Sequence, residues 1–374
     1  MTELRPAAGP HASITPAKFA AKQGTVGMFA FESRYLEGQR RQAVLIDSKQ
    51  SQLNRMEAAL QQAIDDGHPL LTRLPRILVT YDRDGTVEEY SDISLPHRAF
   101  DGHIRAGSID GSPAVRNETY RAARDSTPAN ARPLFDLSPA TIIFGGWDAT
   151  RKSRQWRGRS ALVGEIIGFC SESDEAHPPK RGGARVDPVG MHIYLNQDGM
   201  KDLVADQANE LSEDLQKKAT AKSGKPSRLG LGGIPPGLDS LGGIACDRII
   251  RSHVLSFAAL RQMRFGSGVK GDAACRALLA ALGLNALAKS DAELCLRANC
   301  DLVEAAPSRV TIDRRAGSSD NLRALTVQQA DALLGDALRH AEEVAAVSWQ
   351  GPVLKVVGNP KIVAAAVDDE ASED

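Results

Sequence analysis

The segment 42–67 most constrains the fold, because a short apolar run is followed at once by the pattern of an amphipathic helix with a capping residue at its start. Residues 43–46 are typical of a short buried strand. Asp47 or Ser48 can cap a following helix, since a side-chain oxygen there accepts a hydrogen bond from a free amide of the first turn. Apolar residues then recur at helical spacing and end at a glycine suited to a left-handed conformation: Leu53, Met56, Leu60, Ile64 and Gly67. The other helix face is expected to be polar and comprises Gln50, Asn54, Glu57 and Gln61.

Strand and helix patterns alternate irregularly along the rest of the chain. We expect further strands at 76–83, 86–90, 140–148, 160–169, 190–196, 294–302, 308–313 and 352–357. Helices are predicted at 202–218, 246–266, 272–290 and 327–347, the last with a capping box of Thr326 and Gln329. The irregular order favours an α+β fold with insertions over a doubly wound parallel sheet. We interpret residues 1–367 as one domain, with a flexible insertion at about 217–241 rich in Lys, Gly, Ser and Pro.

Composition argues against several classes of protein. The chain has 374 residues, 42% of them apolar, and a net charge of −1, so it can bury a sizeable core. Its five cysteines show no C-x-x-C spacing, which argues against a disulfide framework and a zinc site, and no cofactor is predicted. The most apolar stretch, 273–288, contains Arg276 and Asn285 and is too short to span a membrane. We therefore expect a soluble cytoplasmic protein without membrane contact.

One loop concentrates positive charge and is the first candidate binding site. Between Asp148 and Glu165 the sequence has no acid, and Trp156 lies there among five cations: Arg151, Lys152, Arg154, Arg157 and Arg159. Single-stranded nucleic acid is held by cations that follow its phosphates and by aromatic rings that stack on its bases, so the loop fits such a ligand. The alternative is a solvated hairpin tip whose indole packs on its own sheet.

Two further segments carry candidate binding residues, each with an ordinary structural alternative. Gln50, Asn54 and Arg55 would project from the start of the first helix, whose amino terminus suits a phosphate; the alternative is capping and a polar face. His97 and Arg98 fit the acid–base and phosphate-binding pair of a ribonuclease. A structural pair, or a phosphate contact by Arg98 alone, also explains them.

The remaining motifs are weaker. Lys270 lies in the glycine-rich segment GSGVKGD, which lets backbone approach a phosphate closely or serves as a turn between helices. The segment does not match the G-x-x-x-x-G-K-[ST] pattern of nucleotide hydrolases. In LCLRANCDL, Arg297 is a further candidate RNA contact, and a buried pair of Arg297 and Asp301 is the structural alternative. The sequence has no H-E-x-x-H, no G-x-S-x-G and no Rossmann fingerprint opening a helix, so no motif indicates an enzyme.

The order of the segments is more informative than any one of them. Eight segments follow one another between about residues 14 and 305: ITPAKFA, LIDSKQSQLNRMEAAL, LPHRAF, PATIIFGGWDATRKSRQWRGRSALVGEIIGF, VGMHIYLN, IIRSHVLSFAALRQMRF, ALLAALGLNALA and LRANCDL. In this order they resemble the backbone subunit of type I-G (formerly I-U) CRISPR interference complexes, in the Cas-seven group of RAMP proteins. The most specific pieces are the S-x-x-N-R-x-E helix, the F-G-G-W-D strand end with its basic loop, and the segment from an arginine to C-D-L.

The resemblance implies an RNA-recognition-motif (ferredoxin-like) palm with large insertions, including a thumb hairpin that reaches the next copy. Copies would line up head to tail along one CRISPR RNA, with other subunits of the complex, and present the spacer for pairing with target DNA. Because the spacer differs between guides, contacts should go to phosphate and sugar. The resemblance implies a non-catalytic protein and carries RNA contact over to Gln50, Ser51, Asn54, Arg55, His97 and Arg98. That Trp156 belongs to the thumb is our own inference.

Two alternatives and two predictions accompany this interpretation. An endoribonuclease acting on CRISPR or target RNA would use His97, Asp101 or Asp47, and a structural protein would bind an acidic protein through the basic loop. For an RNA-binding subunit, replacing residues 154, 156 and 157 by alanine should weaken guide-RNA retention without unfolding the protein.

The last seven residues, 368–374, hold five acids and no cation, and we expect this tail to be disordered. We hypothesise that it competes with RNA for the basic groove, so deleting it should raise affinity for unrelated RNA.

Overall fold

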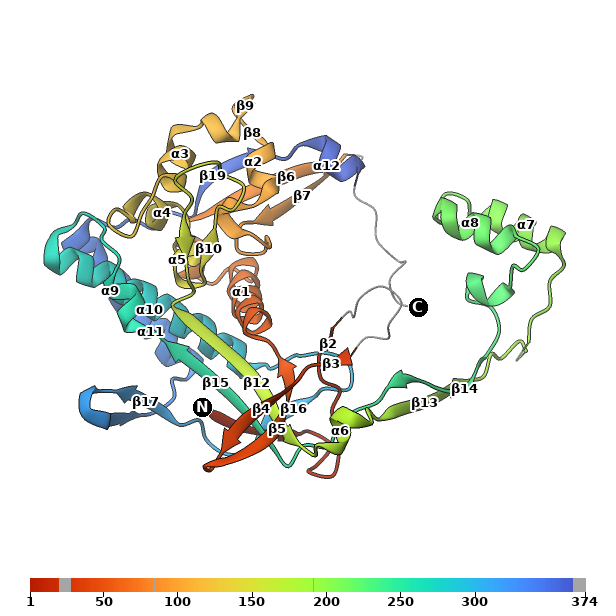
Figure 1. Ribbon diagram of the computed structural model, residues 1–374. Helices are drawn as coiled ribbons and strands as arrows, with labels where there is room; N and C mark the ends of the chain where they lie inside the picture. Colours follow the sequence, from red (N-terminus) through yellow and green to blue (C-terminus); the bar gives the residue numbers. More distant parts are fainter. Residues whose placement is uncertain (20–27, 84, 191, 366–374) are drawn as a thin grey trace.

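The computed structural model describes residues 1–19, 28–83, 85–190 and 192–365, which have the predicted α+β fold. The largest sheet has six strands, and every adjacent pair is antiparallel (Figure 1). In spatial order they are β16 (Leu302–Glu304), β1 (Thr2–Pro6), β15 (Arg248–Leu255), β12 (Leu162–Cys170), β5 (Gln39–Asp47) and β4 (Phe31–Leu36). The strands predicted at 43–46 and 160–169 are therefore confirmed.

Helix α1 (Lys49–Asp65) follows β5 directly, as the sequence predicts. Ser48 caps the helix by accepting a hydrogen bond from the Ser51 amide at 3.2 Å, and Gly67 just beyond it has a φ of 75°. The predicted apolar stripe is buried, and the helix packs against β12 and α10 (Gly268–Ala292). The expectation that Glu57 lies on the exposed polar face of this helix is wrong. Glu57 is only 5% exposed and forms an ion pair with Arg98.

Helix α10 belongs to the main apolar core and packs against α1, α11 (Val327–Ala345) and α5 (Pro139–Ile143). The expectation that its apolar stretch is too short to span a membrane is wrong, because the helix extends beyond 273–288 and is long and apolar enough to cross one; 61% of its most apolar window, however, is buried inside the protein. That burial is typical of a core helix in a soluble protein. The segment GSGVKGD is not a loop between helices, since α10 begins at Gly268 and holds Lys270 in its first turn. The capping box predicted for α11 is confirmed.

A second sheet of five strands stands at the other end of the core (Figure 1). Its order is β7 (Thr86–Ser91), β6 (Arg76–Arg83), β19 (Pro352–Val357), β8 (Ser108–Ile109) and β9 (Ser112–Pro113). Strand β19 runs parallel to β6, so the late strand predicted at 352–357 joins the early hairpin predicted at 76–90. Short helices lie beside this sheet: α2 (Gly102–Ala106), α3 (Glu118–Arg124), α4 (Arg132–Leu137) and α5.

A two-stranded ribbon leaves the body of the molecule and carries a small helical module (Figure 1). The ribbon pairs β13 (Lys180–Arg185) with β14 (Ile234–Leu241). The module contains α7 (Gln197–Asp206) and α8 (Glu213–Thr220), which pack through Met200, Val204 and Ala219. We call the described residues of 180–241 the arm. The single helix predicted at 202–218 is wrong, because Ser212 caps a second helix. The insertion at 217–241 contains the end of α8, a turn at Pro226–Leu229 and β14.

Four other predictions from the hydrophobic pattern are wrong. Residues 246–266 contain strand β15 and only the short helix α9 (Phe257–Arg261). The reverse error occurs at 140–148, where Ser138 caps helix α5 and only β10 (Gly146–Trp147) is a strand. Pro139 favours this helix, since proline is suited to a first helical position. Residues 192–196 and 294–301 form no strand, and Met191 lies outside the described residues.

The remaining elements are short. Strands β17 (Val310–Asp313) and β18 (Ser319–Leu322) form a hairpin, which confirms the strand predicted at 308–313. Strand β11 (Arg157–Gly158) pairs with β10, and β2 (Lys18–Phe19) pairs with β3 (Met28–Phe29). Helices α6 (Ser173–Ala176) and α12 (Pro360–Ala364) complete the set. The acidic tail, 368–374, lies outside the described residues.

Candidate functional site

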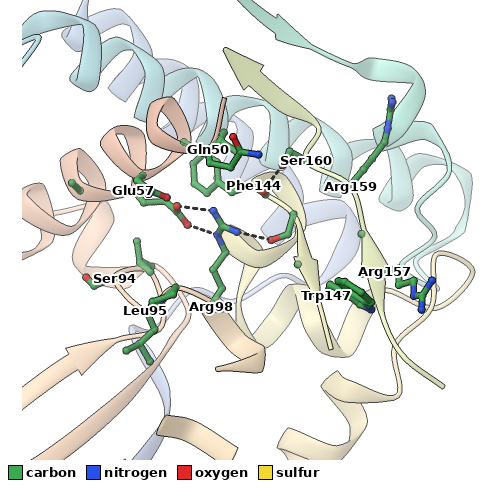
Figure 2. Close-up of a pocket in the computed structure, with 18 residues that line it drawn as sticks. Gln50, Glu57, Ser94, Leu95, Arg98, Phe144, Trp147, Arg157, Arg159 and Ser160 are labelled. Carbon is green, nitrogen blue, oxygen red and sulfur yellow. Dashed lines mark hydrogen bonds and ion pairs between the residues drawn. The ribbon is translucent and has the colours of Figure 1, made fainter. Parts of the chain in front are cut away.

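A groove of about 1080 Å³ opens between three segments that are far apart in the sequence (Figure 2). The first segment is the first half of α1, the second is the loop at residues 93–98, and the third runs from residue 144 to residue 160 and contains β10 and β11. The sequence analysis identified candidate residues in each segment separately. The structure brings five of them together along the groove: Gln50, Asn54, Arg98, Arg157 and Arg159.

A buried ion pair joins the first two segments. Arg98 Nη2 donates a hydrogen bond to Glu57 Oε2 at 2.7 Å, and Arg98 Nε donates to the other carboxylate oxygen. Arg98 Nη1 also donates to the Gly145 carbonyl at 3.1 Å, so one guanidinium connects all three walls (Figure 2). Burial raises the pKa of Glu57, although the bonds from Arg98 oppose that shift. Arg98 is thus a structural partner of Glu57, with its charge largely neutralised inside the protein.

Strands β10 and β11 form a short ribbon at the opposite wall. Their register places Gly146 opposite Gly158 and Trp147 opposite Arg157. The guanidinium carbon of Arg157 lies 4.9 Å from the centroid of the Trp147 ring, which is within cation–π distance. The Trp147 side chain is 54% exposed. Sequence analysis did not select Trp147, although it stands at the end of the F-G-G-W-D motif beside the basic loop.

Ion pairs behind the ribbon hold the basic loop in place. Arg124 on α3 makes two bonds to the buried Asp148, with Nε–Oδ2 and Nη2–Oδ1 distances of 2.8 and 3.0 Å. Arg151 pairs with Asp125 and donates to the Arg124 carbonyl at 2.6 Å. Arg151 therefore anchors the loop to α3, and its charge is already partnered.

Trp156 does not have the role that the sequence suggested. The residue is 3% exposed and belongs to the main apolar core, so neither ring face is open to a base. A Cβ on Gly158 would lie 2.5 Å from the Trp156 Nε1 atom, which shows how closely the ribbon covers the indole. The stacking role assigned to Trp156 is therefore wrong, and Trp147 is the exposed indole of this region.

Four cations of the loop remain at the surface: Lys152, Arg154, Arg157 and Arg159 are all exposed. Among the residues that the structure describes, none of the four forms an ion pair with a carboxylate. Arg159 donates to the Ser256 hydroxyl at 2.8 Å, and Arg157 donates to the Gln155 side-chain oxygen at 3.1 Å. Because Arg157 and Arg159 both line the groove, this wall carries uncompensated positive charge.

A second polar cluster surrounds Asp47, at the junction of β5 and α1. Its carboxylate is fully buried and accepts bonds from Ser51 Oγ at 2.9 Å, Arg55 Nε at 3.0 Å and Arg297 Nη2 at 2.7 Å. Burial raises the pKa of Asp47, but bonds from Arg55, Gln52 and Ser51 outweigh it and hold the pKa below its ordinary value. Three predicted RNA contacts, Ser51, Arg55 and Arg297, are therefore bound to an internal acid.

The cluster also corrects the expected Arg297–Asp301 pair. Arg297 bonds instead to Asp47 and, through Nη1, to the Ile46 carbonyl at 2.7 Å. Arg55 Nη2 bonds to the Leu296 carbonyl at 3.2 Å. These bonds fasten the irregular segment 294–301 to the start of α1 and account for Arg297 without a strand.

Of the remaining predicted contacts, Lys152, Arg154, His97 and Lys270 also lie outside the groove lining. His97 is exposed and adjoins the groove, while its backbone amide donates to Asp101 Oδ2 at 3.0 Å. Asp101 is buried, and its other oxygen accepts the His103 amide at 2.9 Å. Lys270 is exposed on α10 and is not part of the groove.

One comparison with known proteins finds a similarity over the first part of the chain. Residues 1–172 match the family model described as CRISPR-associated protein GSU0053. The matched residues, a little under half of the chain, are similar to that family, and they contain all three segments of the groove. No curated protein matches the chain.

Proposed function

We propose that the chain is the non-catalytic, RNA-binding backbone subunit of a type I-G CRISPR interference complex. The observation that carries this proposal is the convergence of the three segments into one groove whose far wall holds two exposed arginines and an exposed indole. Cations and aromatic rings in one groove are the usual means of holding a single strand. The family match over residues 1–172 supports a role in CRISPR systems.

The groove suits contacts to the sugar-phosphate backbone. Gln50 and Asn54 are exposed on the first turns of α1 and line the groove, so their side-chain amides can bond to phosphate or ribose oxygens. Arg157 and Arg159 would neutralise phosphates on the opposite wall. None of these contacts requires a particular base, which fits a guide whose spacer varies and whose bases must stay free for pairing with DNA.

The arm, rather than the loop that holds the buried Trp156, fits the thumb of a head-to-tail filament. It projects from the body (Figure 1) and presents exposed apolar side chains, including Val186, Val189, Tyr194 and Ile234. An exposed apolar group of this kind suits contact with another protein surface, and a neighbouring copy on the same RNA would supply it. Because each copy would grip a few nucleotides, affinity would accumulate along the filament. We place this assembly in the cytoplasm.

The surroundings of the candidate acids support a non-catalytic role. Asp47 is saturated by arginine, glutamine and serine, and both Asp101 oxygens accept backbone amides. Both carboxylates are buried, at 0% and 3% exposure, and neither lines the groove, so neither is presented to a bound strand. A cleavage assay of the purified assembly on labelled CRISPR and target RNA with Mg²⁺ tests the endoribonuclease alternative. Cleavage that Asp47→Asn or Asp101→Asn abolishes would favour that alternative.

Co-purification with RNA tests the proposed function itself. The tagged chain would be purified from cells that contain the other subunits and a CRISPR array, and the bound RNA would be sequenced. We expect CRISPR RNA with its spacer, in smaller amounts for Arg157→Glu and in unchanged amounts for Lys270→Glu, which reverses an exposed charge outside the groove. An assembly that contains no CRISPR RNA would refute the proposal.

A further inference from the structure

We propose that Trp147 and Arg157 together form a stacking platform that receives one unpaired base of the bound strand. This inference rests on the proposed function and adds a residue-level site for a nucleobase. The ligand class is a single-stranded nucleic acid, because an unpaired base exposes the π-face that an indole can cover. No other part of the proposed site among the described residues offers an exposed aromatic ring.

The backbone of the ribbon forces these two side chains outward. Side chains alternate between the two faces of a strand, and the neighbours of the pair, Gly146 and Gly158, face the core. A Cβ on Gly146 would lie 2.8 Å from Thr141 Cγ2, and one on Gly158 would lie 2.5 Å from the Trp156 ring. Both contacts are too close for any side chain. The two glycines therefore let the ribbon lie flat on the core, with Trp147 and Arg157 on its outer face.

The platform is held in position before a ligand arrives. Gln155 Oε1 accepts a hydrogen bond from Trp147 Nε1 at 3.4 Å and another from Arg157 Nη2 at 3.1 Å. Gln155 Nε2 donates to the Ala149 carbonyl at 3.0 Å, which fixes the amide itself. One amide therefore fixes both members of the pair. A preorganised pair loses little conformational entropy on binding.

One face of the indole is available to a ligand. Arg157 lies on one side of Trp147, and Arg98 with Glu57 lies across the groove on the other side (Figure 2). The groove volume of about 1080 Å³ is sufficient for a nucleotide. A base inserted from the groove would stack on the open face, and Arg157 behind the ring would be free to contact the adjoining phosphate. Stacking accepts every base, as a variable guide requires.

The chain contains its own fluorescent reporter for this contact. Of its three tryptophans, Trp156 and Trp349 are 3% and 1% exposed, while Trp147 is 54% exposed. Quenching of tryptophan emission by a bound strand will therefore report mainly on Trp147. The full chain would be titrated with a labelled single-stranded RNA, and emission and the anisotropy of the label would be recorded together. Anisotropy measures binding, and emission measures stacking.

We expect wild-type emission to be quenched in step with binding. Trp147→Ala should bind RNA roughly tenfold more weakly, a loss of about 1.4 kcal/mol, because the stacking contact with one base is removed. Trp147→Phe should keep most of the affinity and lose the quenching. Tyr35→Ala, which removes an aromatic ring that is 76% exposed outside the groove, should bind like the wild type. Unfolding curves of all variants will show that each is folded.

The two readouts separate failure of the platform from failure of the proposed function. RNA binding without quenching, together with unchanged affinity of Trp147→Ala, would overturn the platform and leave the RNA-binding role intact. Absence of RNA binding by the wild type would overturn both. A DNA strand of the same sequence should also quench, because the indole contacts only the base. Quenching by DNA alone would overturn the assignment of the platform to the guide RNA.

Discussion

Glu57 and Arg98 form a buried ion pair that ties helix α1 to the loop at residues 93–98, with 2.7 Å between Oε2 and Nη2. The same guanidinium bonds to the Gly145 carbonyl, at the start of the segment that holds Trp147 and the basic loop. The geometry of the groove therefore depends on a largely buried ion pair within its own lining. The sequence pattern instead predicts that Glu57 lies on an exposed polar helix face and that Arg98 contacts RNA.

Removing the charge of Glu57 should destabilise the protein. Glu57→Gln leaves the largely buried Arg98 without a counter-ion, and breaking a buried pair from one side costs about 3–5 kcal/mol. We expect a loss near the lower limit, since Arg98 keeps its bond to Gly145, and urea unfolding will measure it. Gln50→Ala on the exposed face of the same helix should change stability by less than about 0.5 kcal/mol. A Glu57→Gln variant as stable as the wild type would contradict this account of the pair.

The triple alanine variant of residues 154, 156 and 157 now has a different expected outcome. Trp156→Ala opens a cavity in the core and should cost about 3–5 kcal/mol in unfolding free energy. Arg154→Ala and Arg157→Ala change exposed side chains, so they should leave the melting temperature nearly unchanged, and Arg157→Ala should weaken RNA retention. Thermal unfolding of the three single variants will separate these effects. If Trp156→Ala melts at the same temperature as the wild type, the wild-type indole is not packed in the core.

Salt dependence distinguishes a groove cation from one elsewhere. Each phosphate neutralised on a single strand contributes about −0.7 to the slope of log affinity against log salt concentration. Arg159→Gln should therefore make the slope shallower by about 0.7. Lys270→Gln removes one exposed charge outside the groove and should leave the slope unchanged. Equal effects of the two variants would mean that the RNA path is not confined to the groove.

Local signals in the sequence were sufficient for several elements. The cap at Ser48, the apolar stripe of α1 and Gly67 each act on residues only a few positions away in the sequence, so the predicted helix is correct. The pattern predicts a helix where strand β15 lies, because Arg251 is a charged residue and the pattern does not place it in the core. That arginine is 1% exposed only because Asp291 and Glu304, distant in sequence, lie 3.1 and 3.0 Å away. A pattern of residue types contains no information about such partners.

The candidate site was predictable in its segments but not in its assembly. Sequence analysis selected Gln50, Asn54 and the basic loop, yet nothing local shows that they meet across one groove. Which indole is buried depends on the β10–β11 register and on the space beneath Gly158, and both are set by tertiary packing. The same holds for Asp47, which withdraws Arg55 and Arg297 from the surface. An arginine in a motif can serve the fold as readily as it serves a ligand.

His253 makes the free energy of unfolding depend on pH. Burial lowers the pKa of His253 to about 3, and its Nε2 lies 3.2 Å from Gln52 Oε1. The neutral ring is favoured in the folded state. Its contribution to the free energy of unfolding is therefore complete above the unfolded pKa of about 6.5 and is lost as pH falls towards 3. His253→Gln should reduce the decline in unfolding free energy below pH 6.5 by up to about 1.4 kcal/mol per pH unit. Urea unfolding at pH 7 and pH 5 checks this, with the exposed His97→Gln as a control that should decline like the wild type.

Crosslinking to the guide tests the central claim most directly. CRISPR RNA containing 4-thiouridine would be assembled with the full complex, irradiated, and the crosslinked peptides of this chain identified by mass spectrometry. The account predicts crosslinks in the first turns of α1, in residues 93–98 and in residues 144–160, including Trp147. Crosslinks confined to other surfaces, such as the β17–β18 hairpin, or no crosslinks to this chain, would contradict it.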